Sequence, residues 1–416
     1  MSDQYTRTGD DRLFQQAVDA FMRRQYPQAL PLLERAAAGG NVEAQNLLGV
    51  MQLNGMGSAP DARRAAACFE SAACRGLKEA QYNLSNLLFN GLGVGADEVR
   101  AQDMLLASAR AGHRPALRSL GLLYHDAGGD DPQWAALATY CFRQAAGAGD
   151  PPAQYLLGLR LSHGHGIAAD PAGAARWFAA AAQSGVYLAA AKLAAMQQPS
   201  EDHSHLPEVQ AELMTCALAE LPEPTPSRAK DFISEHPRAL DEYLADHIVN
   251  VAAPMLMPSN VVDPHTGAAV KSEFRTSHSM HYQPSMYDAA THLALRRIAR
   301  IAGLPVNHAE PLGVLRYGVG QEYRPHYDYY SDDQHHAQRV ATVFVYLNPV
   351  EEGGGTDFPR LGLAVEPERG KAVKFLNCDA RGRPNPETLH AGLPVIRGEK
   401  WLATLWFWDR PFDWFR

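Results

Sequence analysis

The sequence predicts a multidomain protein: an all-α solenoid of helical repeats, followed by an α+β domain built on a jelly-roll-like β barrel. Three observations lead to this fold class. An alanine and glycine pattern recurs five times before residue 196. A polar and proline-containing stretch between residues 197 and 226 then interrupts the helical pattern. From about residue 230, short β-rich runs bounded by Gly, Pro, Asn or Asp replace it.

The repeats can be counted from one alanine in each unit. These alanines are spaced by 36, 36, 37 and 36 residues, at Ala44, Ala80, Ala116, Ala153 and Ala189. Each has a glycine four residues before it and a leucine four residues after it, as in Gly40 and Leu48. The glycine suits a left-handed helix end, and the alanine and leucine share one face of the helix that follows. The spacing therefore predicts a stack of antiparallel helix pairs.

The repeating pattern, "A-A-x-x-G-x-x-x-A-x-x-x-L-G" followed by "G-x-G" in several units, resembles the SEL-like branch of the tetratricopeptide-type repeats. The resemblance covers roughly residues 12 to 196. It implies a right-handed superhelix with a concave face that binds other proteins. We therefore expect a protein partner on the helical repeats.

The domain boundaries follow from the breaks in the pattern. We expect a SEL-like repeat domain over 1–200, a linker over 201–229 that could hold one bridging helix near 207–220, and an α+β domain over 230–416. Within the last domain the expected strands are 313–317, 340–347, 371–376, 393–396 and 401–408, preceded by helices near 238–256 and 284–302.

Composition limits the class of partner and the compartment. A formal charge of -8 and a pI near 6.1 give no electrostatic reason to expect nucleic acid or an anionic membrane. No run approaches the roughly 18 to 20 apolar residues of a membrane span, and we expect a cytoplasmic protein. The five cysteines are scattered without a C-x-x-C pair, which disfavours a disulfide framework or a zinc site.

His326-Tyr327-Asp328 has the local form of part of an iron site. Fe(II) that activates dioxygen is held by two histidines and one carboxylate, with open positions opposite. On one extended strand, residues i and i+2 point to the same side, so both side chains could reach one ion. An H-x-D motif is expected about once by chance in a chain with 17 histidines, so the motif alone is weak.

The context of the motif strengthens it. His390 follows further along the chain, and Lys400 stands ten residues later, at the start of a strand rich in tryptophan and phenylalanine. Burying that lysine is costly unless an anion meets it. The distal carboxylate of 2-oxoglutarate is a natural partner, since its other end can chelate iron.

Several blocks of the C-terminal half, in the family's order, resemble the prolyl 4-hydroxylases over roughly residues 230 to 412. They are Leu315-Arg316-Tyr317-Gly318 running through Gly320 to Asp328, Arg339 to Asn348, Gly353 to Pro359, Leu389 to Val395, and Gly398-Glu399-Lys400-Trp401. The resemblance implies a double-stranded β-helix core and an Fe(II)- and 2-oxoglutarate-dependent dioxygenase that uses O2, with ascorbate as a further candidate reductant.

Site residues follow from the same resemblance, position by position. His326, Asp328 and His390 would hold the iron, and Lys400 would anchor 2-oxoglutarate as a fourth residue of the catalytic centre. Tyr317 and Thr356 would line the co-substrate pocket and Trp406 would wall it. The substrate contacts would come from Arg275, Ser277, Tyr323 and Arg339. Gly355 and Trp408 differ from the residues usual at these positions in the family, so the identity of the peptide substrate stays open.

The resemblance implies oxidative decarboxylation of 2-oxoglutarate coupled to hydroxylation of a protein substrate, most simply at a proline. The segment 263–290 and the loop 331–338 would exclude water. His335 and His336 fit a solvated surface loop better than a second metal site. Two alternatives stay open: the same chemistry on another residue or a small molecule, or a repeat-based adaptor whose oxygenase fold is vestigial.

Overall fold

The computed structural model describes residues 2–128, 131–196, 212–214, 224–226, 228–230, 232–262, 269–271, 275–330, 337–379 and 381–414. The chain divides into two compact units. The first comprises Met1–Ala219 with Gln283–His292, and the second Glu220–Tyr282 with Leu293–Trp414. Most of the predicted bridging helix and the pair His335-His336 lie outside the described residues.

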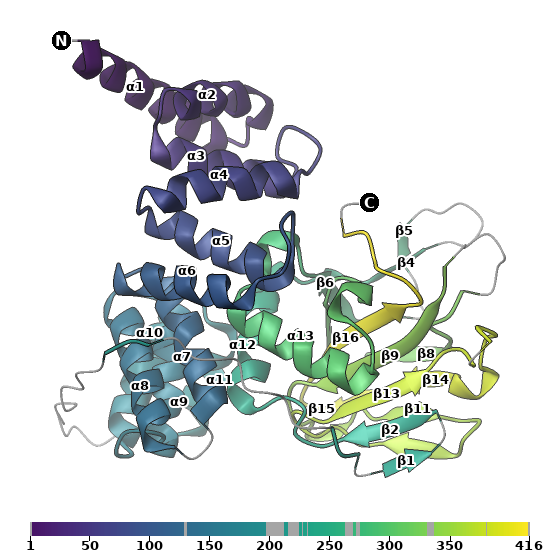
Figure 1. Ribbon diagram of the computed structural model, residues 1–416. Coiled ribbons are helices and arrows are strands. Elements are labelled where there is room, and N and C mark those ends of the chain that lie inside the picture. Colours follow the sequence, from purple (N-terminus) through teal and green to yellow (C-terminus); the bar gives the residue numbers. More distant parts are fainter. Residues whose placement is uncertain are drawn as a thin grey trace. The chain divides into compact units, whose positions relative to one another are not determined.

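The first unit is helical, coloured purple to blue in Figure 1. Its helices are α1 (Ser2–Met22), α2 (Tyr26–Ala38), α3 (Val42–Leu53), α4 (Ala62–Cys74), α5 (Lys78–Asn90), α6 (Glu98–Arg110), α7 (Arg114–Gly128), α8 (Pro132–Gly147), α9 (Pro151–His163), α10 (Pro171–Gln183) and α11 (Tyr187–Ala195). Among the described residues, no helix combines the length and apolar character that a membrane crossing requires.

The alanine register predicts the packing of this unit correctly. All five register alanines, Ala44, Ala80, Ala116, Ala153 and Ala189, are completely buried. The five glycines that precede them have φ between +74° and +92°, the left-handed region that ends a helix at little cost for glycine. At Gly158 a Cβ would lie 2.7 Å from the Phe178 ring, so the glycine lets an aromatic ring of the next helix pack against the backbone. Small residues therefore set the spacing between helices.

The second unit is a β structure of two main sheets. Its strands are β1 (Arg228–Lys230), β2 (Ile233–His236), β3 (Met257–Pro258), β4 (Asn260–Val262), β5 (Ala269–Lys271), β6 (His278–His281), β7 (Gly313–Tyr317), β8 (Tyr323–His326), β9 (Arg339–Tyr346), β10 (Glu352–Gly353), β11 (Thr356–Phe358), β12 (Leu363–Val365), β13 (Ala372–Leu376), β14 (His390–Gly392), β15 (Val395–Arg397) and β16 (Lys400–Trp408). In the described part of the chain, eight strands form a sheet in the order β1-β2-β13-β9-β16-β7-β6-β3, and four form another in the order β12-β11-β14-β8.

Antiparallel pairing and non-sequential strand order give this unit its double-stranded β-helix character. β16 pairs with both β7 and β9, although 50 or more residues separate it from either. Aromatic and aliphatic side chains of both sheets form one core, which includes Tyr317, Phe344, Phe358 and Phe375. Two helices, α12 (Glu242–Ala252) and α13 (Ala289–Ala302), precede the main strands, shorter than the predicted 238–256 and 284–302.

One predicted strand is wrong in a way that matters for the site. We expected a single strand to carry both His326 and Asp328, but β8 ends at His326 and Asp328 lies at a bend beyond it. Pro325 lacks a backbone N–H, which suits β8 only because β8 is the edge strand of the four-stranded sheet. Asp328 turns instead toward β9, where Thr342 donates a hydrogen bond to it.

Candidate metal site

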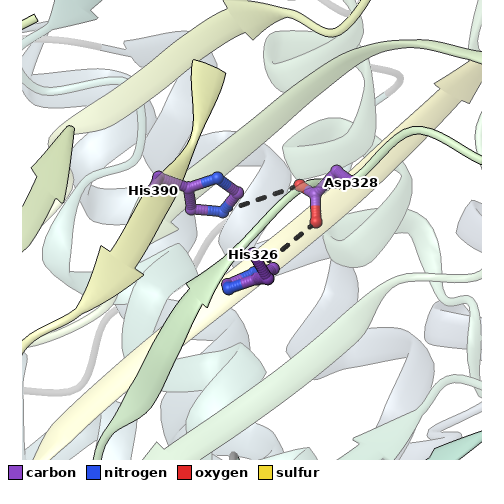
Figure 2. A group of neighbouring side chains, drawn as sticks. All are labelled: His326, Asp328 and His390. Atoms are coloured by element: carbon purple, nitrogen blue, oxygen red, sulfur yellow. Dashed lines mark ion pairs between the residues drawn. The ribbon is translucent and has the colours of Figure 1, made fainter. Parts of the chain in front are cut away.

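His326, Asp328 and His390 meet in the second unit although 62 residues separate Asp328 from His390. β14 pairs with β8 so that His390 stands directly opposite His326. One ligand atom from each of the three side chains lies within 4.8 Å of the others. His326 Nε2 is 3.7 Å from Asp328 Oδ1, and His390 Nε2 is 3.9 Å from Oδ2 (Figure 2). Among the described residues, these histidine and acidic side chains form a group that could together hold a metal ion.

Both imidazoles are held by backbone carbonyls. His326 Nδ1 lies 2.8 Å from the carbonyl of Arg324, and His390 Nδ1 lies 3.0 Å from the carbonyl of Thr388. A carbonyl only accepts, so each Nδ1 carries the proton and donates it. Each Nε2 is then the unprotonated nitrogen, with its lone pair available to a metal ion.

The charges of the three groups also suit a cation. Burial, and then the neighbouring His390, lower the pKa of His326, which keeps the imidazole neutral. Burial opposes ionisation of Asp328, but His390, His326 and Arg339, together with the Thr342 hydroxyl, outweigh it and lower the pKa of Asp328. The donor set of non-haem Fe(II) oxygenases is two imidazole nitrogens and one carboxylate.

Lys400 provides a buried positive charge in the same cavity. It begins β16, is completely buried, and its Nζ has no hydrogen-bond acceptor among the described residues. Nζ lies over the Tyr317 ring, 4.7 Å from its centroid. Burial lowers the pKa of Lys400 to about 7. A buried ammonium group without an acceptor is costly, so an anionic ligand would complete this site.

The space beside Lys400 is kept open by glycine. A Cβ on Gly392 would lie 3.4 Å from Lys400 Nζ, so a side chain there would occupy part of the room in front of the ammonium group. A Cβ on Gly354, whose φ is +71°, would lie equally close to Cδ of the same lysine. The cavity therefore fits a carboxylate at the lysine and a metal ion at the three ligands.

The three predicted co-substrate residues also line this cavity. Tyr317 lies on β7 opposite Lys400 in the strand pairing. Thr356 lies on the other sheet, and its hydroxyl is hydrogen-bonded to that of Tyr346 at 2.8 Å. Trp406 lies on β16, and its Nε1 is buried without a hydrogen-bond acceptor among the described residues.

The predicted substrate residues fall into two groups. Arg275 and Tyr323 line the cavity: they pair as an isolated antiparallel bridge, with the guanidinium 5.2 Å from the Tyr323 ring centroid. The Tyr323 ring in turn stacks on His326, with centroids 3.5 Å apart. These two side chains lie at the candidate metal site.

The polar groups of Ser277 and Arg339 are already bonded to other residues of the protein. The Ser277 hydroxyl is 2.8 Å from that of Ser259, and the residue is only 2% exposed. The Arg339 guanidinium pairs with Glu310, and its Cζ lies 4.6 Å from the Trp406 ring centroid and 5.0 Å from that of Tyr330. Neither is among the residues that line the cavity.

Sequence reasoning missed several residues that support the site. Thr342 and Asn377 form a hydrogen-bonded chain to Asp328, and Tyr346 holds Thr356. The alternation of β9 gave a usable signal, because Thr342 and Phe344 lie two residues apart and both line the cavity. Asn377 follows the end of β13, so its direction could not be inferred from a strand pattern.

Family models match both halves of the chain. Residues 312–408 match the 2OG-Fe(II) oxygenase superfamily. Residues 13–41, 42–77, 78–113 and 151–186 match the Sel1 repeat. The Sel1 resemblance is thereby confirmed, and the C-terminal half is confirmed as an oxygenase of this superfamily.

Individual proteins are similar to this chain over part of its length. Prolyl 4-hydroxylase 5 of Arabidopsis thaliana is 35% identical over 205 residues, which cover 42% of this chain and 70% of that protein. A viral collagen prolyl hydroxylase from Paramecium bursaria Chlorella virus 1, solved with 2-oxoglutarate, is 28% identical, with a TM-score of 0.36, over 43% of this chain and 97% of that one. A Sel1 repeat protein from Oxalobacter formigenes is also 28% identical, with a TM-score of 0.38, over 44% of this chain and 74% of that one.

Proposed function

Because the chain belongs to the prolyl 4-hydroxylase family, we propose that it hydroxylates prolyl residues of a protein substrate, using Fe(II), 2-oxoglutarate and O2. The observation that carries the proposal is the presence, in one cavity, of a two-histidine, one-aspartate cluster and a buried lysine without an acceptor.

His326, Asp328 and His390 would hold Fe(II), and Lys400 would bind the distal carboxylate of 2-oxoglutarate. When bound, these groups supply the oxidising chemistry, because oxidative decarboxylation of 2-oxoglutarate at Fe(II) activates dioxygen for insertion into a carbon–hydrogen bond. The protein contributes positioning: backbone carbonyls direct the two Nε2 atoms toward one point, and the ammonium group of Lys400 fixes the depth at which a dicarboxylate enters.

The apolar side chains of the cavity would exclude water from the reaction. Leu315, Phe344 and Leu402 line it beside the polar groups. Tyr323, stacked on His326, and Arg275 above it would lie between the metal site and the peptide. Arg275 and Tyr323 are therefore stronger candidates for substrate contact than Ser277 and Arg339, whose polar groups are already bonded within the protein.

The Sel1 repeats would bind a protein, either the substrate or a partner that brings it. A role for ascorbate in restoring oxidised iron and a cytoplasmic location remain predictions from the sequence.

The test is turnover by the full chain. Purified protein loaded with Fe(II) should release succinate from 2-oxoglutarate in air, and release should rise with a proline-containing peptide that gains the mass of one oxygen atom. His326→Ala should abolish both signals, whereas His308→Ala, on a histidine outside the cavity, should retain them. Hydroxylation at another residue would redirect the proposal, and absence of turnover with every peptide and partner lysate would favour the adaptor alternative.

A further inference from the structure

Asp328 is held by the buried Thr342, which Asn377 holds in turn, and the family resemblance assigned no role to either residue. Thr342 Oγ1 lies 2.8 Å from Asp328 Oδ2, and Asn377 Nδ2 lies 2.9 Å from Thr342 Oγ1. Thr342 is 1% exposed, and Asn377 is completely buried. Thr342 lies on β9 and Asn377 follows β13, so the chain of hydrogen bonds crosses two neighbouring strands of the large sheet.

The direction of these hydrogen bonds is determined by their chemistry. The amide nitrogen of Asn377 can only donate, so it donates a hydrogen bond to the Thr342 oxygen. The single proton of that hydroxyl is then directed to Asp328, whose carboxylate accepts. Oδ2 is therefore engaged by the protein, although it also lies 3.9 Å from His390 Nε2, while Oδ1 lies 3.7 Å from His326 Nε2.

We propose that Asn377 and Thr342 are positioning residues that reserve Asp328 Oδ2, so that Asp328 binds the metal through Oδ1 alone. This inference rests on the proposed metal site. A six-coordinate Fe(II) with three protein donors keeps three positions, two for a chelating 2-oxo acid and one for dioxygen. A carboxylate that chelated through both oxygens would take one of these positions. The hydroxyl of Thr342 would therefore protect co-substrate binding as well as metal affinity.

The decisive experiment is metal titration of the full, metal-free chain with Co(II), followed by visible absorption under anaerobic conditions. Thr342→Val keeps the shape of the side chain and removes the hydroxyl, and we expect about a 10- to 100-fold loss of Co(II) affinity. Thr342→Ser restores the hydroxyl and should bind Co(II) as the unmodified protein does. Asn377→Leu keeps the Thr342 hydroxyl but removes its hydrogen-bond donor, so this variant should lose less Co(II) affinity than Thr342→Val.

A second titration tests the one-oxygen mode. With Co(II) at saturation, 2-oxoglutarate should bind Thr342→Val more weakly than Thr342→Ser, because a chelating Asp328 competes for its position. Equal Co(II) and 2-oxoglutarate affinities in Thr342→Val and the unmodified protein would overturn the proposal. So would equal weakness in Thr342→Ser and Thr342→Val, which would assign the effect to packing.

Folding and the proposed reaction are separable from this result. Near-ultraviolet circular dichroism of the metal-free variants checks folding, and if Thr342→Val does not fold, the comparison of Asn377→Leu with Thr342→Ser decides. Co(II) binding needs no turnover. A chain that binds Co(II) in this ranked order but hydroxylates no proline would contradict the proposed function while supporting the role of Thr342.

A separate observation concerns the repeats. The hydroxyl of Tyr124, on α7, donates to the carbonyl of Met214 and accepts from the N–H of the same residue at 3.0 Å. Arg110, at the end of α6, donates to the carbonyl of Leu213 at 2.7 Å, and the Leu213 side chain is 7% exposed. Three main-chain groups and one apolar side chain of the predicted linker are thus bound on the repeat unit.

We infer that Arg110 and Tyr124 form a peptide-binding site that reads main-chain groups, with the chain's own residues 212–214 as its occupant. Because the polar contacts are made to the backbone, the site selects an extended segment with a leucine-like side chain rather than a particular sequence. A partner segment of that kind has to displace the linker.

Hydrogen exchange and peptide binding test this inference on the full chain. The Met214 amide should be protected, and Tyr124→Phe should remove the protection while Tyr140→Phe, a matched change on α8, leaves it. A labelled synthetic peptide of residues 207–219 should bind Leu213→Asp, whose linker is released, at least tenfold more tightly than the unmodified chain. Failure of the peptide to bind Leu213→Asp, or retention of binding after Tyr124→Phe is added, would overturn it.

Discussion

The two units treat buried positive charge in opposite ways. In the repeats, Arg160 is 1% exposed, and its guanidinium meets Thr139 Oγ1 at 3.0 Å and His125 Nδ1 at 3.0 Å, as well as the carbonyl of Ala135. In the oxygenase unit, Lys400 is equally buried and finds no acceptor among the described residues. A buried charge that serves the fold is satisfied by the fold, whereas Lys400 has the character of a group that awaits a ligand.

The largest expected effect separates ligand binding from folding at Lys400. Lys400→Met should weaken 2-oxoglutarate binding by about 100-fold or more, since removing one member of a buried charge pair typically costs about 3–5 kcal/mol. Calorimetry on anaerobic, Mn(II)-loaded protein measures it. Lys374→Met, on a half-buried lysine of β13 outside the cavity, is the matched control and should bind as before. An unchanged affinity in Lys400→Met would remove the main support for the co-substrate site.

Substitution of Arg160 should lower the stability of the fold, whereas substitution of Lys400 should raise it. Arg160→Met leaves a buried hydroxyl and a buried carbonyl with fewer partners, so we expect a loss of roughly 3 kcal/mol in the free energy of unfolding, measured with urea. Lys400→Met should instead raise the urea midpoint of the metal-free protein, because it removes an unpaired buried charge. If both variants lose stability equally, the proposed contrast between structural and functional charge is wrong.

The pH dependence of 2-oxoglutarate binding follows from the lowered pKa of Lys400, about 7 in the ligand-free protein. An anion at the ammonium group raises that pKa again, so binding above pH 7 takes up a proton. The dissociation constant should therefore rise with pH above 7, by up to about tenfold per unit, and level off below it. Titrations in buffers with different ionisation enthalpies should detect the proton uptake, and Lys400→Met should show neither effect.

The same shift has a consequence for folding of the metal-free chain. The unfolded state holds its lysine proton up to about pH 10.4, whereas the folded state releases it near 7, so the unfolded state binds more protons between these values. The contribution of Lys400 to stability should therefore rise with pH in that window. Urea unfolding of the unmodified chain and of Lys400→Met at pH 7 and 9 isolates this contribution, and a difference between the two that falls with rising pH supports it.

The smallest effect tests the repeat register. Gly112 has φ of +74° with open space around its Cα, so Gly112→Ala should cost about 1 kcal/mol of stability from backbone strain alone. Gly147 lies within α8, also with open space, and Gly147→Ala should be neutral or stabilising by up to about 1 kcal/mol. Thermal unfolding of the two variants distinguishes a conformational requirement for glycine from a general effect of the added methyl group.

The repeats could be predicted from the sequence because their determinants are local. Each repeat packs mainly against the repeats next to it in the chain. The same alanine is therefore buried, and the same glycine adopts a left-handed conformation, every 36 or 37 residues. Periodicity predicted less of the oxygenase unit. His326 and His390 come together through strand pairing, and their association was expected from family resemblance rather than from spacing.

The finer features of the site depend on side-chain partners that a sequence does not reveal. Asp328 leaves the strand that His326 ends, since its carboxylate is held from β9 by Thr342. Ser277 lies two residues from Arg275, and Arg339 belongs to the same motif block as Thr342. Ser259 and Glu310 nevertheless engage the polar groups of Ser277 and Arg339. Such pairings are decided by three-dimensional packing, and they rank the substrate candidates in a way that motif positions alone could not.

The most direct measurement is anomalous scattering from crystals grown anaerobically with Fe(II) and 2-oxoglutarate. We expect one iron peak bonded to Nε2 of His326, Nε2 of His390 and Oδ1 of Asp328, with the distal carboxylate of 2-oxoglutarate on Lys400 Nζ. Iron at another position, or a co-substrate whose carboxylate leaves Lys400 without a partner, would contradict the assignment.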